Sequence, residues 1–112
     1  MQKSFRYALT GVKDALQSEP NLRFHFFVAI IVFVLAIFLK FTNFELALLI
    51  ITISMVIVLE LVNTAVEKIV DLHSKEISDE ARTIKDISAA VVLLGAIASI
   101  LIGFLLFLPK LV

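Results

Sequence analysis

Four polar residues recur along one segment of this chain: Glu60, Asn63, Glu67 and Asp71, spaced three, four and four positions apart. On an α-helix this spacing puts them on one face, in a row of roughly 16 Å at 1.5 Å per residue. We call these four residues the polar row. Its first member lies within or at the edge of an apolar segment, where an ionisable group costs up to about 2.5–3.5 kcal/mol in a bilayer. The row therefore indicates a functional site, with a purely structural row of interhelical hydrogen bonds as the alternative.

Two further charged residues, Glu19 and Lys85, each stand just before another apolar segment. Carboxylates can hold Mg²⁺, which also binds phosphate oxygens, and a lysine ammonium can meet a phosphate as a point charge. A further carboxylate can accept the proton of an acceptor hydroxyl. Spacing alone predicts a membrane protein with an acidic site, and phosphoryl transfer is one option for that site among several.

The composition indicates a membrane protein. The chain has 112 residues, of which 61% are hydrophobic and 18% charged, and its mean hydropathy is +1.06. Soluble domains have about 45–50% apolar and about 25% charged residues. There is no cysteine, which excludes disulfides and thiolate metal sites, and the zero net charge gives no reason to expect a nucleic-acid partner.

Three apolar segments, at about 24–41, 46–66 and 87–108, are long enough to cross a bilayer, which takes about 20 residues. The second reaches that length only if it continues past Glu60. Residues 2–22 carry apolar side chains at helical spacing opposite charged ones, which predicts an amphipathic helix on the membrane surface. We therefore expect an all-α integral membrane protein, a surface helix plus three transmembrane helices, in a single domain covering residues 1–112.

The basic residues predict the orientation. The four polar segments, in chain order, carry four, one, four and one Lys or Arg. Because cytoplasmic segments hold the excess of positive charge, the N-terminus and the segment after the polar row should be cytoplasmic. The acidic site would then lie on the face of the membrane where ATP is available.

The chain resembles a known family. The polar row and its neighbours fit the E-x-x-N-[ST]-A-[IV]-E-x-x-[VI]-D signature of the prokaryotic diacylglycerol kinases, with Lys85-Asp86 as the family's K-D block and Glu19 and Arg23 as its E-x-x-x-R element. The resemblance covers nearly the whole chain. It implies a small homotrimeric lipid kinase of the bacterial plasma membrane, dependent on ATP and Mg²⁺, with its sites between subunits near the cytoplasmic interface.

The resemblance also implies roles for individual residues. Glu60 matches the catalytic base, and Glu19 and Glu67 match the metal ligands. The positions matching phosphate-positioning or other nucleotide contacts are Tyr7, Asn63, Glu76, Ser78, Lys85 and Asp86.

The lipid acceptor is predicted by resemblance alone. The element from Asn21 to His25 and the ending around Pro109 look like the Gram-positive branch of the family, which consists mainly of undecaprenol kinases. Undecaprenol is therefore the first expectation and diacylglycerol the alternative. A small proton-coupled transporter subunit, with Glu60 as proton carrier, is the alternative from another class.

Two features of the sequence also favour an oligomer. The polar row would face lipid in a monomer, which is costly. Gly95, Ser99 and Gly103 recur every fourth residue, a pattern that lets helix backbones approach closely. These small residues serve equally well for packing against the chain's own helices.

Overall fold

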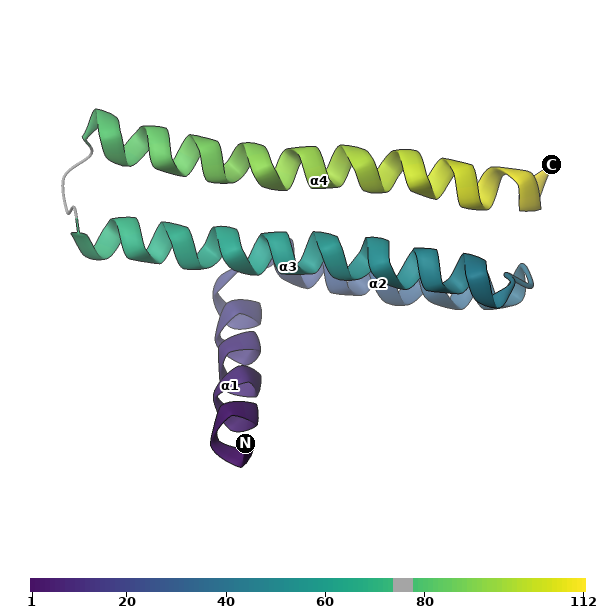
Figure 1. The fold of residues 1–112 in the computed structure, drawn as a ribbon, viewed down its shortest axis with the longest axis horizontal. Helices are drawn as coiled ribbons and strands as arrows, with labels where there is room; N and C mark the ends of the chain where they lie inside the picture. Colours follow the sequence, from purple (N-terminus) through teal and green to yellow (C-terminus); the bar gives the residue numbers. More distant parts are fainter. Residues whose placement is uncertain (74–77) are drawn as a thin grey trace.

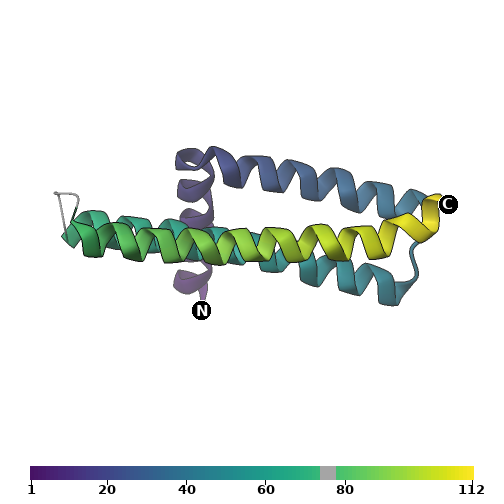
Figure 2. The same ribbon diagram turned by 90° about the horizontal axis from the view of Figure 1, so that it is seen from above.

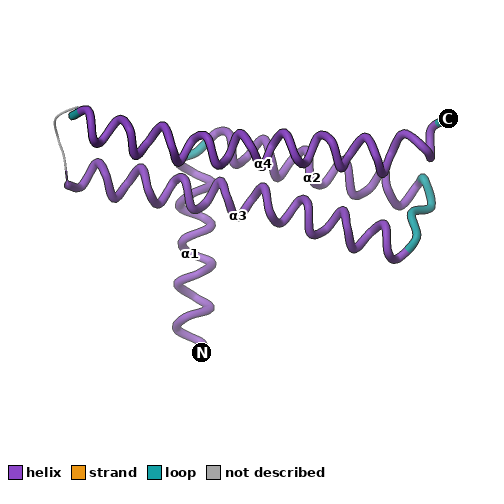
Figure 3. Tube along the Cα trace, turned by 45° about the horizontal axis from the view of Figure 1, so that its top comes forward, coloured by secondary structure: helices purple, strands orange, loops and turns teal. Residues whose placement is uncertain are grey.

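The chain is helical almost throughout. The computed structural model describes residues 1–73 and 78–112, which form α1 (Gln2–Ser18), α2 (Pro20–Phe38), α3 (Asn43–His73) and α4 (Asp79–Leu111). Short loops separate α1 from α2 and α2 from α3 (Figure 3). The last three helices are long and apolar enough to cross a membrane. The predicted all-α fold with an amphipathic first helix and three transmembrane candidates is confirmed.

The first helix is shorter than predicted because a proline interrupts it. Pro20 occupies the first position of α2, where its missing N–H is no loss. The residue before a proline avoids helical angles, and Glu19 is extended, with φ −119° and ψ 104°. The predicted helix over 2–22 therefore ends at Ser18, and α1 runs crosswise to the other three helices (Figure 1).

Arg23 stabilises the elbow between α1 and α2. Its guanidinium Nη1 donates hydrogen bonds to the backbone carbonyls of Leu16 at 2.6 Å and Gln17 at 3.1 Å. The last carbonyls of a helix have no partner within that helix, so an arginine from the next helix can satisfy them. This contact holds α1 in its crosswise direction, which is the direction a helix on a membrane surface needs beside membrane-spanning neighbours.

The other end of the bundle is closed by apolar packing and one ion pair. The rings of Phe41 and Phe107 lie 4.8 Å apart between centroids, and the Lys110 ammonium forms an ion pair with Glu45 at 2.9 Å. Glu45 also accepts a hydrogen bond from the backbone N–H of Thr42, while its own N–H donates to the Thr42 hydroxyl. This reciprocal pair is a capping box, which begins α3 beside the end of α4.

Helices α3 and α4 are longer than the predicted spans. They contain 31 and 33 residues, roughly 46 and 50 Å at 1.5 Å per residue, against about 30 Å for the hydrocarbon core of a bilayer. They run side by side, and both continue past the place where α1 meets the bundle (Figure 1). The boundaries predicted at 66 and 87 mark where the apolar residues stop. Beyond residue 66, α3 continues to His73, and α4 already begins at Asp79; we call these two polar ends the two-helix extension.

The α3–α4 contact depends on Gly95, which is buried. A Cβ atom there would lie 2.5 Å from Leu59 Cδ1. At Gly103 an added Cβ would meet nothing within 4 Å. Gly95 therefore packs within the chain, which is the second of the two roles predicted for the small residues.

Gly95→Val is expected to lower the stability of the folded chain by about 1–3 kcal/mol, the usual cost of overpacking. The flexible Leu59 side chain can move aside for one methyl group but not for a branched side chain. Thermal unfolding in detergent, followed by circular dichroism, measures the change. Gly103→Val is the matched control, and equal melting temperatures for the two variants would contradict the assigned contact.

Candidate active site

The polar row lies on one face of α3, and its burial decreases along the helix. Glu60 is 7% exposed, Asn63 and Glu67 are half-buried, and Asp71 is exposed. Glu60 is the eighteenth residue of α3, roughly 26 Å from its start. The row therefore begins inside the bundle and ends on the two-helix extension, at the end of the bundle opposite the ion pair of Glu45 and Lys110.

Glu60 has a partner on α2. Its Oε1 lies 3.1 Å from Nε2 of His25, and the two side chains are 9% and 28% exposed. Thr64 donates its hydroxyl proton to the backbone carbonyl of Glu60 and leaves the carboxylate to His25. We expected this carboxylate to need shielding by a neighbouring chain. That expectation was wrong for Glu60, because α2 already covers it within one chain.

The middle of the row is tied to α4. Ser88 donates its hydroxyl proton to Asn63 Oδ1 at 2.7 Å, and Asn63 Nδ2 donates to Glu67 Oε1 at 3.1 Å. An amide whose oxygen already accepts from Ser88 must direct its NH₂ group toward Glu67. The three side chains form one continuous hydrogen-bonded chain across the two helices.

Ser88→Ala is expected to lower kcat/KM for ATP about fivefold, the effect of losing one hydrogen bond of about 1 kcal/mol. Without the Ser88 hydroxyl, the Asn63 amide is free to rotate away from Glu67. Steady-state kinetics in detergent micelles test this. Thr83→Ala is the control, since Thr83 is exposed and donates its hydroxyl proton to the backbone carbonyl of Asp79 on its own helix. Equal kinetics for the two variants would remove Ser88 from the site.

The predicted lysine contacts the last residue of the polar row. Lys85 Nζ lies 2.7 Å from Asp71 Oδ1, and both side chains are substantially exposed. Lys85 precedes the apolar segment 87–108, and its hydrogen bond to Asp71 raises the pKa of the ammonium above its ordinary value. A permanent positive charge thus lies on the two-helix extension, beside the row, where it can meet an anionic ligand.

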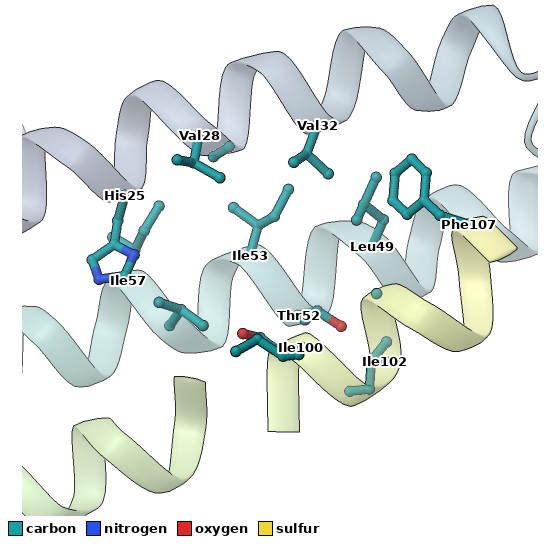
Figure 4. Close-up of a pocket in the computed structure, with 14 residues that line it drawn as sticks. His25, Val28, Val32, Leu49, Thr52, Ile53, Ile57, Ile100, Ile102 and Phe107 are labelled. Atoms are coloured by element: carbon teal, nitrogen blue, oxygen red, sulfur yellow. The ribbon is translucent and has the colours of Figure 1, made fainter. Parts of the chain in front are cut away.

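An apolar groove of about 290 Å³ lies between α2, α3 and α4. Seen from above, α4 lies over the space between α2 and α3 (Figure 2). Figure 4 shows His25 at one end of the groove and Phe107 at the other. The groove therefore runs from the partner of Glu60 toward the apolar end of the bundle. It is lined by His25, Val28, Ala29, Val32, Leu49, Thr52, Ile53, Val56, Ile57, Ser99, Ile100, Ile102, Gly103 and Phe107.

The structure places the other predicted site residues as follows. Glu19 is half-buried at the α1–α2 elbow, and Tyr7 on α1 and Asp86 on α4 are exposed. Ser78 is the N-cap of α4, where its hydroxyl accepts a hydrogen bond from the backbone N–H of Ala81 at 3.0 Å. Glu76 lies outside the described residues. Within residues 1–73 and 78–112, no hydrogen bond or ion pair joins these side chains to the polar row.

A magnesium ion is compatible with the side chains present. Mg²⁺ prefers oxygen ligands, keeps several of its waters and usually takes one or two carboxylates from the protein. Glu19 and Glu67 are half-buried carboxylates, and the donor from Asn63 engages only one oxygen of Glu67. In the part of the chain that the structure describes, no three His, Asp or Glu side chains cluster as a larger metal cage. A two-carboxylate site is therefore the arrangement that these residues could offer.

Two residues of the site were not predicted. In the sequence, His25 was noted only as the last residue of the Asn21–His25 element, and Ser88 was given no role. A polar side chain within an apolar segment was the available signal for both. The role of such a side chain depends on whether its helix face meets another polar residue, and only the packing of the helices shows that.

Comparison with known proteins identifies related chains. The family described as prokaryotic diacylglycerol kinase matches residues 6–107. A diacylglycerol kinase of Synechocystis sp. is 41% identical over 96% of this chain and 62% of its own length. An undecaprenol kinase of Bacillus subtilis is 35% identical over 97% of this chain and 89% of its own length. A diacylglycerol kinase of Haemophilus influenzae is 36% identical over 93% of this chain and 89% of its own length. The chain thus spans less than two thirds of the Synechocystis relative and most of the other two.

Proposed function

The chain belongs to the prokaryotic diacylglycerol kinase family, and on that premise we propose that it transfers the γ-phosphoryl group of ATP to the hydroxyl of diacylglycerol. The prediction of a lipid kinase is confirmed at the level of the family, which leaves the transporter alternative without support. The observation that carries the proposal is the position of Glu60. Its carboxylate is buried at the start of the polar row and contacts His25, which lines one end of an apolar groove.

The proposed reaction is a direct displacement. The lipid hydroxyl oxygen attacks the γ-phosphorus, the bond from that phosphorus to the oxygen bridging the β- and γ-phosphates breaks, and ADP leaves. Glu60 accepts the hydroxyl proton as general base. Its Oε1 is engaged by His25, so Oε2 is the oxygen that takes the proton. The groove gives an acyl chain a place from which its glycerol end reaches this carboxylate.

The rest of the row serves the nucleotide in this proposal. The Lys85 ammonium offsets negative charge on the phosphates, and the Asn63 amide, directed by Ser88, holds a phosphate oxygen. Glu19 and Glu67 would hold Mg²⁺, which supplies neutralisation of the phosphate charge when bound. Tyr7, Glu76, Ser78 and Asp86 are proposed as further nucleotide contacts by their positions in the sequence.

Diacylglycerol replaces undecaprenol as the first acceptor. The 41% identical relative from Synechocystis is named a diacylglycerol kinase, whereas the relative named an undecaprenol kinase is 35% identical. Undecaprenol remains the second candidate, because that relative matches 97% of this chain and 89% of its own length. Both alcohols present a primary hydroxyl, so the same base serves either.

The acceptor can be tested directly. Purified protein in detergent micelles receives ATP, Mg²⁺ and either diacylglycerol or undecaprenol, and the phosphorylated lipid is measured. Phosphatidic acid is the expected product, formed at the higher kcat/KM. Faster formation of undecaprenyl phosphate would establish the second candidate. Failure to phosphorylate either lipid, in folded protein that binds ATP, would overturn the proposed function.

We further propose that the site faces the cytoplasm of the bacterial cell and is completed in a homotrimer. The distribution of basic residues supports the orientation. Exposed apolar side chains on all three long helices leave ample surface for neighbouring chains or lipid. If the sites are shared, mixing Glu60→Gln chains with Glu19→Ala chains should restore activity. Homotrimers that stay inactive after mixing would place both residues of each site in one chain.

A further inference from the structure

We propose that His25 is the positioning residue of the base: its imidazole holds the Glu60 carboxylate so that the second carboxylate oxygen faces the lipid hydroxyl. This inference rests on the proposed kinase function and deepens it. It assigns a role to a side chain that lies outside the polar row, on a different helix.

The contact joins a buried carboxylate to a half-buried imidazole. His25 Nε2 lies 3.1 Å from Glu60 Oε1, within hydrogen-bond distance. An ionised carboxylate can only accept, so in the proposed arrangement Nε2 is the donor. Among residues 1–73 and 78–112, His25 is the one side chain with a hydrogen bond or ion pair to this carboxylate.

Orientation of the carboxylate matters for a general base. The terminal torsion of a glutamate side chain is broad and poorly determined by itself, whereas a base must lie within hydrogen-bond reach of the proton it takes. A donor on α2 removes this freedom by engaging one oxygen. His25 also lines the apolar groove at the end near Glu60 (Figure 4), so the same ring borders the lipid chain and directs the base.

A purely structural pair makes a different prediction. If His25 only compensates a buried charge, its loss destabilises the fold and lowers the amount of active protein without changing the turnover of the molecules that remain folded. If His25 positions the base, its loss lowers kcat in folded protein and leaves KM for ATP unchanged. A side chain that donates from the same distance should then restore turnover.

The test compares His25→Gln with His25→Met. Glutamine places an amide donor near the position of Nε2, and methionine has similar length and no donor. We expect His25→Met to lower kcat about 10–100-fold per folded molecule, the scale of a small misplacement of a catalytic group, and His25→Gln to recover most of that loss. Equal activity of His25→Met and wild type would overturn the inference, as would equal losses in both variants.

A double variant separates positioning from other effects. In a Glu60→Gln background, His25→Met should cause no further loss of turnover, because groups that act as a unit are not additive. A further loss comparable to that of His25→Met alone would show that His25 acts elsewhere. Absence of lipid phosphorylation by the wild-type protein would instead overturn the proposed function itself.

Nitrogen NMR provides a measurement that does not depend on activity. The chain contains two histidines, and a His73→Gln background leaves only the ring signals of His25. Glu60→Gln should shift the ¹⁵N resonances of that ring, while Glu45→Gln, on the same helix, should not. Unchanged ring signals in Glu60→Gln would refute the contact, even if His25→Met fails to fold.

Discussion

Glu60→Gln is expected to lower kcat by about 10²–10⁴-fold, the usual contribution of general acid–base catalysis. Glutamine keeps the size of the side chain and an oxygen that can accept from His25, so the packing of α2 on α3 should survive. What it loses is the lone pair that takes the proton of the lipid hydroxyl. Initial rates of lipid phosphorylation at saturating ATP measure the effect, normalised to folded protein.

Glu45→Gln provides the matched control for this variant. It makes the same chemical change on the same helix, about 22 Å away along the axis, and it weakens the ion pair with Lys110. We expect a lower melting temperature and unchanged kcat for it. Near-normal turnover in folded Glu60→Gln would remove this residue from the mechanism, and a similar fall in both variants would point to a general loss of structure.

Glu67→Gln is expected to abolish activity or to raise sharply the Mg²⁺ concentration needed for half-maximal turnover. Glutamine can still accept the hydrogen bond that Asn63 donates to Glu67, so the link to Ser88 remains while the negative charge is removed. Mg²⁺ binds charged carboxylates far better than amides in such small sites. Titrations of Mg²⁺ at fixed ATP, and of ATP at fixed Mg²⁺, separate metal binding from nucleotide binding.

Glu19→Gln should behave in the same way, since it would supply the second ligand from the α1–α2 elbow. Glu80→Gln is the control, because Glu80 is an exposed carboxylate in the first turn of α4. Titration curves of Glu19→Gln and Glu67→Gln that overlay those of the wild type and of Glu80→Gln would rule out the two-carboxylate site.

The comparisons and the packing each changed one expectation. Resemblance of the Asn21–His25 element led to undecaprenol as acceptor, whereas the relatives favour diacylglycerol. The cost of a polar row facing lipid led to a neighbouring chain as its cover, whereas α2 already buries Glu60. The expectation for Glu60 failed because the helix of the polar row was considered without the helix that packs on it, whereas undecaprenol remains the second candidate acceptor.

The sequence by itself determined the fold class, the three apolar segments and the common face of the polar row. These are local properties: the length of a span follows from bilayer thickness, and the face of a residue follows from helical periodicity. The end of α1 at Ser18 was not predicted, although its cause is local too: Pro20 restricts the residue before it. Only the family signature, also read along the sequence, led from an acidic row to a proposed kinase site.

The tertiary structure alone decided which side chains meet. His25 reaches Glu60 from α2, Ser88 reaches Asn63 across 25 positions, and Lys85 reaches Asp71 across 14. Each contact requires that the two helices have a particular rotation about their axes and a particular shift along them. Close packing at points such as Gly95 sets both. Periodicity assigns a residue to a face of its own helix, but the face of the neighbouring helix that lies opposite is a property of the packed bundle.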